Sequence, residues 1–297
     1  MVKTPYKFSH ISLSTSSSDK RVLPIATQVY EILHNAGIKV SFDATLHKLQ
    51  ERLNKKTKSE RYIKKNSELI IAIGGDGTML NCSRKYGSQG VPVLGINLGK
   101  VGFLTDISPE EITSRLLEVI TGDYAIDERS FLQAKIKGQN AKHMALNEIV
   151  FHSGAIAQLI DFDLFINEKY VYSQKADGLI ISSPSGSTAY SLSGGGPIVL
   201  PNVKAIILLP MFPHSLLNTS PLIVNEDSKI QIQMTDNKRK AVLSMDSHTS
   251  VDLKKGDIVN ISAGKSSLTL IHPPEHDFFE ACRNKLGWSA GFGNKKI

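Results

Sequence analysis

The sequence contains few of the features that mark disulfide-rich, secreted or membrane-spanning proteins. Only two of its 297 residues are cysteines, Cys82 and Cys282, which are too few for a disulfide framework and fit a reducing compartment. No apolar run approaches the roughly 18 residues of a membrane-spanning helix. Residues 1–10 contain no apolar core like that of a signal peptide. We therefore expect a cytoplasmic protein that does not interact with a membrane.

Charge is not concentrated in one part of the chain. There are 35 lysines and arginines against 28 acidic residues, a net charge of +7, which suits anionic partners such as nucleic acids or small phosphorylated ligands. The one basic run, residues 48–65, also contains Glu51 and Glu60. This mixture favours a solvated helix face over a nucleic-acid patch. Charge alone does not identify the partner; taken with the motifs below, we expect small-molecule partners and no nucleic acid.

The order of apolar segments predicts two domains. Strand-like segments at residues 8–13, 69–73 and 91–96 alternate with helical periodicity in residues 1–127, which predicts an α/β domain with a parallel sheet. Residues 128–272 contain strand-like segments separated by turns, which predicts a β-rich domain. Residues 273–297 are expected to return and pack on the first domain. In a parallel sheet, ligands bind at the carboxyl ends of the strands.

The sharpest motif joins a buried strand to a helix and consists of Gly74, Gly75, Asp76, Gly77 and Thr78. Its glycines allow close approach of a ligand, and the helix N-terminus offers N–H groups to a phosphate. It is not the dinucleotide fingerprint, because Leu80 stands where a third glycine is required. Asp76 has three open interpretations: a base for a hydroxyl that attacks phosphorus, a Mg²⁺ ligand, or a turn residue that caps the helix.

Two other segments offer polar groups to a ligand. Residues 185–197 are rich in hydroxyls and glycine, which suits a ribose, an adenine edge or a diphosphate, but also a flexible surface loop. Asn147 and Glu148 lie between apolar neighbours and either reach a ligand or mark an exposed edge. No H-E-x-x-H or C-x-x-C pattern occurs, so we do not expect a metal site built from histidine or cysteine.

Taken in order, these motifs resemble the NAD kinase family. The glycine loop alone is shared with diacylglycerol kinases and phosphofructokinases, whereas the hydroxyl-rich segment is far more specific. The segment 285–288, Lys-Leu-Gly-Trp, is similar to bacterial members. The residues that carry the resemblance are Gly74 to Thr78, Asn147 and Glu148, Asp177 and Gly178, and Gly186 to Pro197.

The resemblance implies a kinase that transfers the γ-phosphate of ATP to the 2′-hydroxyl of the adenosine ribose of NAD, making NADP. It implies Mg²⁺ that enters with ATP, a homo-oligomer (dimer or tetramer), Asp76 as the proton acceptor, and no metal ligand assured among the protein side chains. Gly74, Gly75, Gly77 and Thr78 would form the phosphate loop. The NAD-binding residues it implies are Asp76, Gly77, Asn147, Glu148, Lys175, Asp177, Thr188, Ala189, Tyr190, Ser191, Leu192, Ser193 and His248.

The chain departs from the family pattern at a few positions. Lys175 stands where bacterial relatives often have arginine, and Ser247 and His248 replace a usual Gly-Gln. These departures keep a second interpretation open: a dinucleotide-binding sensor that has lost catalysis. A lipid or sugar kinase that shares the glycine loop is a third. The residues do not distinguish ATP from polyphosphate, or NAD from NADH, and they do not show whether NADPH regulates the protein.

Overall fold

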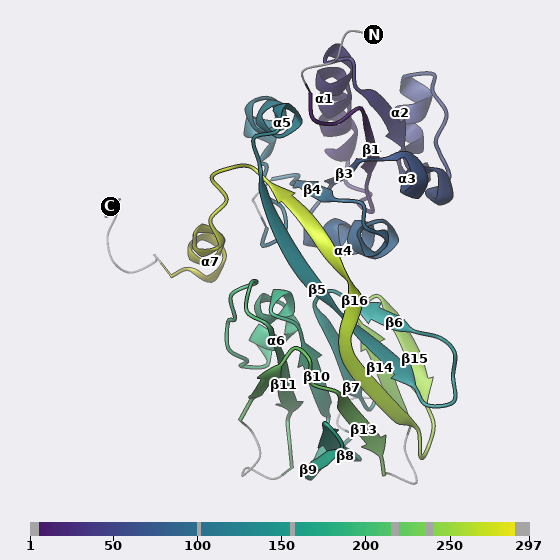
Figure 1. Ribbon diagram of the computed structural model, residues 1–297, viewed down its shortest axis with the longest axis vertical. Helices are drawn as coiled ribbons and strands as arrows, with labels where there is room; N and C mark the ends of the chain where they lie inside the picture. Colours follow the sequence, from purple (N-terminus) through teal and green to yellow (C-terminus); the bar gives the residue numbers. More distant parts are fainter. Residues whose placement is uncertain (1–5, 100–101, 155–157, 215–219, 236–239, 289–297) are drawn as a thin grey trace. The chain divides into compact units, whose positions relative to one another are not determined.

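The computed structural model describes residues 6–99, 102–154, 158–214, 220–235 and 240–288 (Figure 1). It divides into unit 1, Met1–Glu128 with Leu268–Ile297, and unit 2, Arg129–Ser267. The second boundary lies earlier than the expected residue 272. The reason is that Leu270 and Ile271, near the end of β16 (Ile258–His272), pair with β4 (Val93–Ile96) in unit 1. Of the segment expected to return to the first domain, residues 289–297 lie outside the described residues.

Unit 1 contains a parallel sheet in the order β2-β1-β3-β4. The strands β1 (His10–Ser14), β2 (Lys39–Phe42) and β3 (Leu69–Ile73) are short, and every residue of β1 and β3 is buried. Since β2 and β3 lie on opposite sides of β1, the winding of the chain reverses between β1 and β3. Ligands of open α/β sheets bind at such a reversal, outside the carboxyl ends of the strands.

Helices cover both faces of this sheet (Figure 1). Apolar side chains of α1 and α5 join one core with Ile11, Leu13 and Ile71. On the other face α4 packs so closely that a Cβ atom at Gly95 would lie 2.9 Å from the sulfur of Met79. The helical segments of unit 1 are α1 (Val22–Asn35), η1 (Ala44–Leu46), α2 (His47–Arg52), α3 (Glu60–Asn66), α4 (Asp76–Lys85), η2 (Gly87–Gln89), η3 (Pro109–Glu111), α5 (Ile112–Thr121) and α7 (Phe278–Leu286).

Unit 2 is built from antiparallel strands. A six-stranded sheet has the order β12-β11-β10-β7-β14-β15, and the remaining strands pair as β9-β8-β13-β16 and β5-β6. The strands not yet bounded are β5 (Ala125–Ile136), β6 (His143–Ala145), β7 (Glu148–His152), β8 (Ile160–Ile166), β9 (Lys169–Ala176), β10 (Gly178–Ser182), β11 (Ala205–Met211), β12 (Leu222–Asn225), β13 (Ile230–Met234), β14 (Ala241–Met245) and β15 (Thr249–Leu253).

The core of unit 2 lies between its two groups of strands. Alternate residues of β7, β10 and β14 face alternate residues of β8, β13 and β16, as in a sandwich of two sheets. Phe151 of β7 meets Phe162 of β8 edge to face, with ring centroids 5.3 Å apart. The predicted fold class, an α/β domain followed by a β-rich domain, is confirmed. None of the helices in the described residues is long and apolar enough to cross a membrane.

Candidate active site

The glycine loop follows β3 directly and leads into α4. Gly74 has a φ of +155°, and a Cβ atom there would lie 2.1 Å from the side-chain oxygen of Thr78, so only glycine fits. The hydroxyl of Ser16, which follows β1, donates to that same Thr78 oxygen at 3.1 Å. The loop is therefore fixed at the sheet reversal, with its side chains turned inward and its backbone available to a ligand.

Asp76 is the first residue of α4, but it does not cap this helix. Its carboxylate accepts the backbone N–H groups of Phe103 (3.0 Å) and Leu104 (3.1 Å), in the loop after β4. A Cβ atom at Gly102 would lie 2.0 Å from Asp76 Oδ1, so that glycine makes room for the carboxylate. The interpretation of Asp76 as a helix-capping turn residue is therefore wrong. Oδ1 also accepts a long hydrogen bond from the Thr105 hydroxyl (3.5 Å), whereas Oδ2 accepts only the Phe103 N–H and keeps a lone pair for a substrate hydroxyl.

The N-terminus of α4 has no side-chain cap. Gly77, in its first turn, is exposed, and a Cβ atom there would meet nothing within 4 Å. The fold of unit 1 therefore does not require glycine at this position. A bare, open helix N-terminus is a site where phosphate groups bind, because free N–H groups and the helix dipole both favour negative charge.

A cavity of about 480 Å³ in unit 1 contains hydroxyls that the sequence motifs did not identify. It lies at the carboxyl ends of β1 and β2, and Ser16 connects it to the glycine loop. Lys20 and Lys48 add positive charge to its lining. In the sequence, the serine run 16–18 predicts only a turn. The one feature that could have indicated a ligand site is that this run follows the first strand of a parallel sheet. The other lining residues are Thr15, Ser17, Ser18, Asp19, Val22, Leu23, Thr45, Leu46, His47 and Leu49.

In unit 2, Asn147 and Glu148 are held by a buried aspartate. The Asp246 carboxylate accepts the N–H groups of Leu146 (2.9 Å) and Asn147 (2.8 Å). Burial, reinforced by the negative charge of Asp246, raises the pKa of Glu148 to about 7. Asn147 Oδ1 and Glu148 Oε2 are buried and accept no hydrogen bond from the described residues. Buried acceptors without a donor are rare in proteins and point to a missing ligand.

The hydroxyl-rich segment packs against this pair. It forms η4 (Ser185–Thr188) and α6 (Tyr190–Ser193) rather than a flexible surface loop. A Cβ atom at Gly186 would lie 2.1 Å from the Asn147 carbonyl oxygen, so glycine permits the approach. The buried Ser191 hydroxyl also has no partner among the described residues, and Tyr190 is exposed. The segment thus adds a third buried polar group without a partner among the described residues.

The predicted residues are distributed over both units. Asp76 and the glycine loop belong to unit 1, and all the others belong to unit 2. Unit 2 brings Asn147 and Glu148 together with the segment from Thr188 to Ser193, but the side chains of Lys175 and His248 are exposed. The backbone of Asp177 donates to the Met211 carbonyl at 3.0 Å. Buried Arg129, which no motif indicated, donates to the Ser185 hydroxyl at 2.9 Å.

Comparison with known proteins assigns both halves of the chain to one family. Residues 11–124 match the ATP-NAD kinase N-terminal domain, and residues 146–273 match the ATP-NAD kinase C-terminal domain. The chain is 40% identical over 291 residues to the NAD kinase of Alcanivorax borkumensis, covering 97% of each chain. It is 45% identical over 230 residues to that of Chromohalobacter salexigens, covering 76% of this chain and 78% of the other.

Solved structures agree with the sequence comparison. The crystal structure of yeast NADH kinase complexed with NADH matches with a TM-score of 0.86 and 26% identity, covering 100% of this chain and 94% of the other. An Archaeoglobus fulgidus NAD kinase in complex with ATP matches with a TM-score of 0.72 and 26% identity, covering 94% and 97%. With the glycine loop, Asn147 and Glu148 in the structural contexts described, the chain belongs to the NAD kinase family.

Proposed function

We propose that this chain phosphorylates NAD at the 2′-hydroxyl of its adenosine ribose, with ATP as donor and NADP and ADP as products. Asp76 accepts the proton of the hydroxyl as its oxygen attacks the γ-phosphorus, and the bond from that phosphorus to the β–γ bridging oxygen breaks. The unpaired acceptors Asn147 Oδ1 and Glu148 Oε2 carry the proposal, because the hydroxyls and amino group of an adenosine supply the missing donors.

The geometry around Asp76 supports its role as the base. Two backbone N–H groups hold the carboxylate in one orientation, so little reorganisation is needed when the hydroxyl arrives. Phosphoryl transfer depends mainly on positioning and on neutralising charge, and one oriented base with a bare helix N-terminus provides both. The A. fulgidus relative with ATP and the yeast relative with NADH support a nucleotide donor and a dinucleotide acceptor.

The donor is proposed to be ATP with bound Mg²⁺. Around Asp76 the described residues provide no group of three His, Cys, Asp or Glu ligands; the one such group, Asp106 with His272 and His276, lies elsewhere in unit 1. Mg²⁺ commonly keeps several waters and binds through one or two carboxylates and the substrate phosphates, so these residues fit an ion that enters with the triphosphate. Ser16, Lys20 and Lys48, which line the 480 Å³ cavity, suit that anionic donor.

Two further aspects belong to this proposal. The chain acts in the cytoplasm, where the free, buried thiols of Cys82 and Cys282 stay reduced. It forms a homo-oligomer, a dimer or a tetramer, and the exposed apolar side chains of Leu222 and Ile223 on strand β12 support this. Light scattering coupled to size-exclusion chromatography measures the subunit number, and a monomer at micromolar concentration contradicts the oligomer.

The direct test measures NADP formation with an NADP-specific dehydrogenase. Purified full-length protein should produce NADP only when NAD, ATP and Mg²⁺ are all present. Saturable NAD binding without NADP formation would favour the sensor that has lost catalysis. Absence of NAD binding would contradict the dinucleotide site itself, and a panel of sugar and lipid acceptors would then identify the acceptor. Replacing ATP with polyphosphate, and NAD with NADH, defines the donor and acceptor ranges in the same assay.

A further inference from the structure

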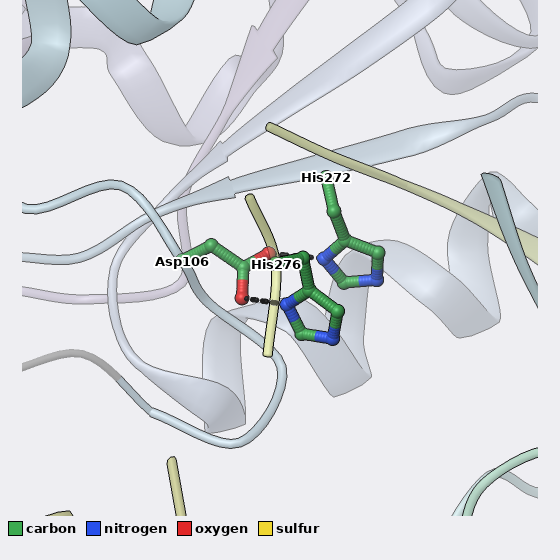
Figure 2. A group of neighbouring side chains, drawn as sticks. All are labelled: Asp106, His272 and His276. Carbon is green, nitrogen blue, oxygen red and sulfur yellow. Dashed lines mark hydrogen bonds and ion pairs between the residues drawn. The ribbon is translucent and has the colours of Figure 1, made fainter. Parts of the chain in front are cut away.

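Three side chains from distant parts of the sequence meet in unit 1: Asp106, His272 and His276 (Figure 2). Asp106 Oδ2 contacts Nδ1 of His272, and Asp106 Oδ1 lies 2.9 Å from Nδ1 of His276. One ligand atom of each residue lies within 4.8 Å of the other two, an arrangement that no other group of His, Cys, Asp and Glu shares in the described part of the chain. Two imidazole nitrogens and a carboxylate oxygen thus converge on one point.

The backbone fixes these side chains from two directions. His272 is the last residue of β16, whose Leu270 and Ile271 pair with β4. Asp106 precedes Ile107, which forms a bridge with Ile96 at the end of β4. Between the histidines, Pro273 and Pro274 limit the turn, and the two rings stack with centroids 3.9 Å apart and planes 16° apart. The three donors are therefore oriented before any ion binds.

A second carboxylate faces the other side of the buried histidine. His272 is 1% exposed, and its Nε2 lies 3.6 Å from Asp127 Oδ2. In metal sites, the ring nitrogen that does not bind the ion typically faces a carboxylate, which fixes the ring and makes the coordinating nitrogen more basic. Asp127 is placed to do this for His272, which leaves Nδ1 for an ion.

The cluster borders a cavity that can complete a coordination shell. This cavity has a volume of about 310 Å³, and Asp106 and His276 form part of its lining. Three protein ligands leave a fourth position open for water in a tetrahedral zinc site. The other charged residues that line the cavity are Glu111, Arg115, Glu275, Asp277 and Glu280.

We propose that Asp106, His272 and His276 bind one divalent transition-metal ion of the zinc type. Two imidazoles favour Zn²⁺, Co²⁺ or Ni²⁺ over Mg²⁺, so the site is separate from the Mg²⁺ that accompanies ATP. The ion would join the end of β16 to the loop after β4. That loop also supplies the backbone N–H groups of Phe103 and Leu104 that hold Asp76.

The test begins with full-length protein stripped of metal by a chelator. We expect one Zn²⁺ per chain by calorimetry, an unfolding temperature that rises by several degrees with Zn²⁺, and no such effect of equimolar Mg²⁺. With Co²⁺ in place of Zn²⁺, visible absorption of the intensity typical of four-coordinate cobalt should appear. Failure to bind Zn²⁺ with at least micromolar affinity would overturn the proposal and leave the cluster as an ion-pair network.

Variants identify the ligands. His276→Gln and Asp106→Asn should each weaken Zn²⁺ binding about 100-fold or more, and Asp127→Asn about 10- to 100-fold. The matched control is His34→Gln, an exposed histidine at the end of α1, which should bind Zn²⁺ like the parent chain. Equal affinities for His276→Gln and His34→Gln would overturn the proposal.

A cysteine variant keeps the test decisive if His276→Gln does not fold. His276→Cys supplies a thiolate at the same place and should still bind Co²⁺, with a sulfur-to-cobalt charge-transfer band in the near ultraviolet. The Co²⁺-loaded parent chain, which keeps the buried thiols of Cys82 and Cys282, is the control: a band present in His276→Cys and absent from the parent comes from residue 276. Its absence in a folded, Co²⁺-loaded His276→Cys protein would exclude residue 276 as a ligand and overturn the site.

Discussion

At the scale of single residues, Asp76 combines a chemical and a structural role. Asp76→Asn removes the base, so turnover should fall about a hundredfold or more. It also turns an amide NH₂ toward the N–H of Phe103 or Leu104, which should cost about 1 kcal/mol of unfolding free energy. Steady-state kinetics and urea unfolding measure the two effects separately, and calorimetry should show that NAD binding is nearly unchanged.

Thr105→Val is the matched control for this variant. The Thr105 hydroxyl accepts hydrogen bonds from the Asn97 side chain (2.7 Å) and the Gly102 N–H (3.0 Å), and it donates a long one to Asp76 Oδ1 (3.5 Å). Its loss therefore loosens the same loop, while the N–H groups of Phe103 and Leu104 still hold the carboxylate. We expect a similar loss of stability but a much smaller loss of turnover. Equal turnover losses in the two variants would make loop order, not proton transfer, the contribution of Asp76.

Glu148 makes the stability of the protein depend on pH. Its pKa is raised to about 7 in the folded state from 4.5, so the folded state binds this proton more tightly than the unfolded chain. Unfolding free energy therefore falls as the pH rises from about 4.5 through 7, by an amount on the order of 3 kcal/mol. Glu148→Gln removes this loss. In urea unfolding without NAD, the unfolding free energy of Glu148→Gln minus that of the parent should therefore increase from pH 5 to pH 8. If the two pH profiles run parallel, the raised pKa of Glu148 is contradicted.

The turn between β14 and β15 carries backbone strain. Asp246 and Ser247 have φ angles of +47° and +52°, in the left-handed region that favours glycine. Asp246 cannot be exchanged, because its carboxylate holds the backbone of Leu146 and Asn147. Ser247→Gly should raise the unfolding free energy by about 0.5–1 kcal/mol, measured by urea denaturation. Thr249→Gly, in the adjacent strand, is the control and should destabilise.

At the scale of elements, Gly77 lowers the stability of α4 in its first turn. Gly77→Ala adds a methyl group into open space and should stabilise the helix by about 1 kcal/mol. The same methyl group obstructs close approach to the helix N-terminus, so we expect a several-fold higher KM for ATP or NAD. Asn81→Ala, on the same helix but outside the glycine loop, is the control: it should stabilise without changing KM. An unchanged KM in Gly77→Ala would remove Gly77 from the binding site.

Several elements were predictable from local patterns, and others were not. The strands of unit 1 follow from apolar runs, and their parallel sheet follows from their alternation with helices, whereas the order β2-β1-β3-β4 and its reversal at β1 do not. The hydroxyl-rich segment was ambiguous because its composition is typical of loops. It becomes helical because the Ser187 hydroxyl donates to the Pro184 carbonyl (2.6 Å) and accepts from the Val199 N–H (3.0 Å). Val199 lies twelve positions further along the chain, so no local sequence pattern encodes this contact.

At the scale of the whole molecule, long-range pairing limits what the sequence reveals. Sequence motifs identified the candidate residues Asp76, Asn147 and Glu148. The hydrogen bond from the Asn147 N–H to the Asp246 carboxylate, however, joins residues 99 positions apart. His272 and His276 have the H-x3-H spacing found in metal sites, but Asp106 lies 166 residues from His272, so no local motif could complete their cluster. Motifs that carry chemical groups within a short segment can be predicted from the sequence. Contacts between distant segments cannot, because they depend on how the strands pair.

The pairing of β16 with β4 also sets an order for folding during synthesis. Val93 of β4 is made long before its partner Leu270, and both units contain part of β16. A nascent chain that ends at residue 128 would expose the edge of β4, with unpaired N–H and C=O groups that attract other strands. The parallel sheet of unit 1 is completed only when residue 271 has left the ribosome, so the first unit to be translated is the last to be finished.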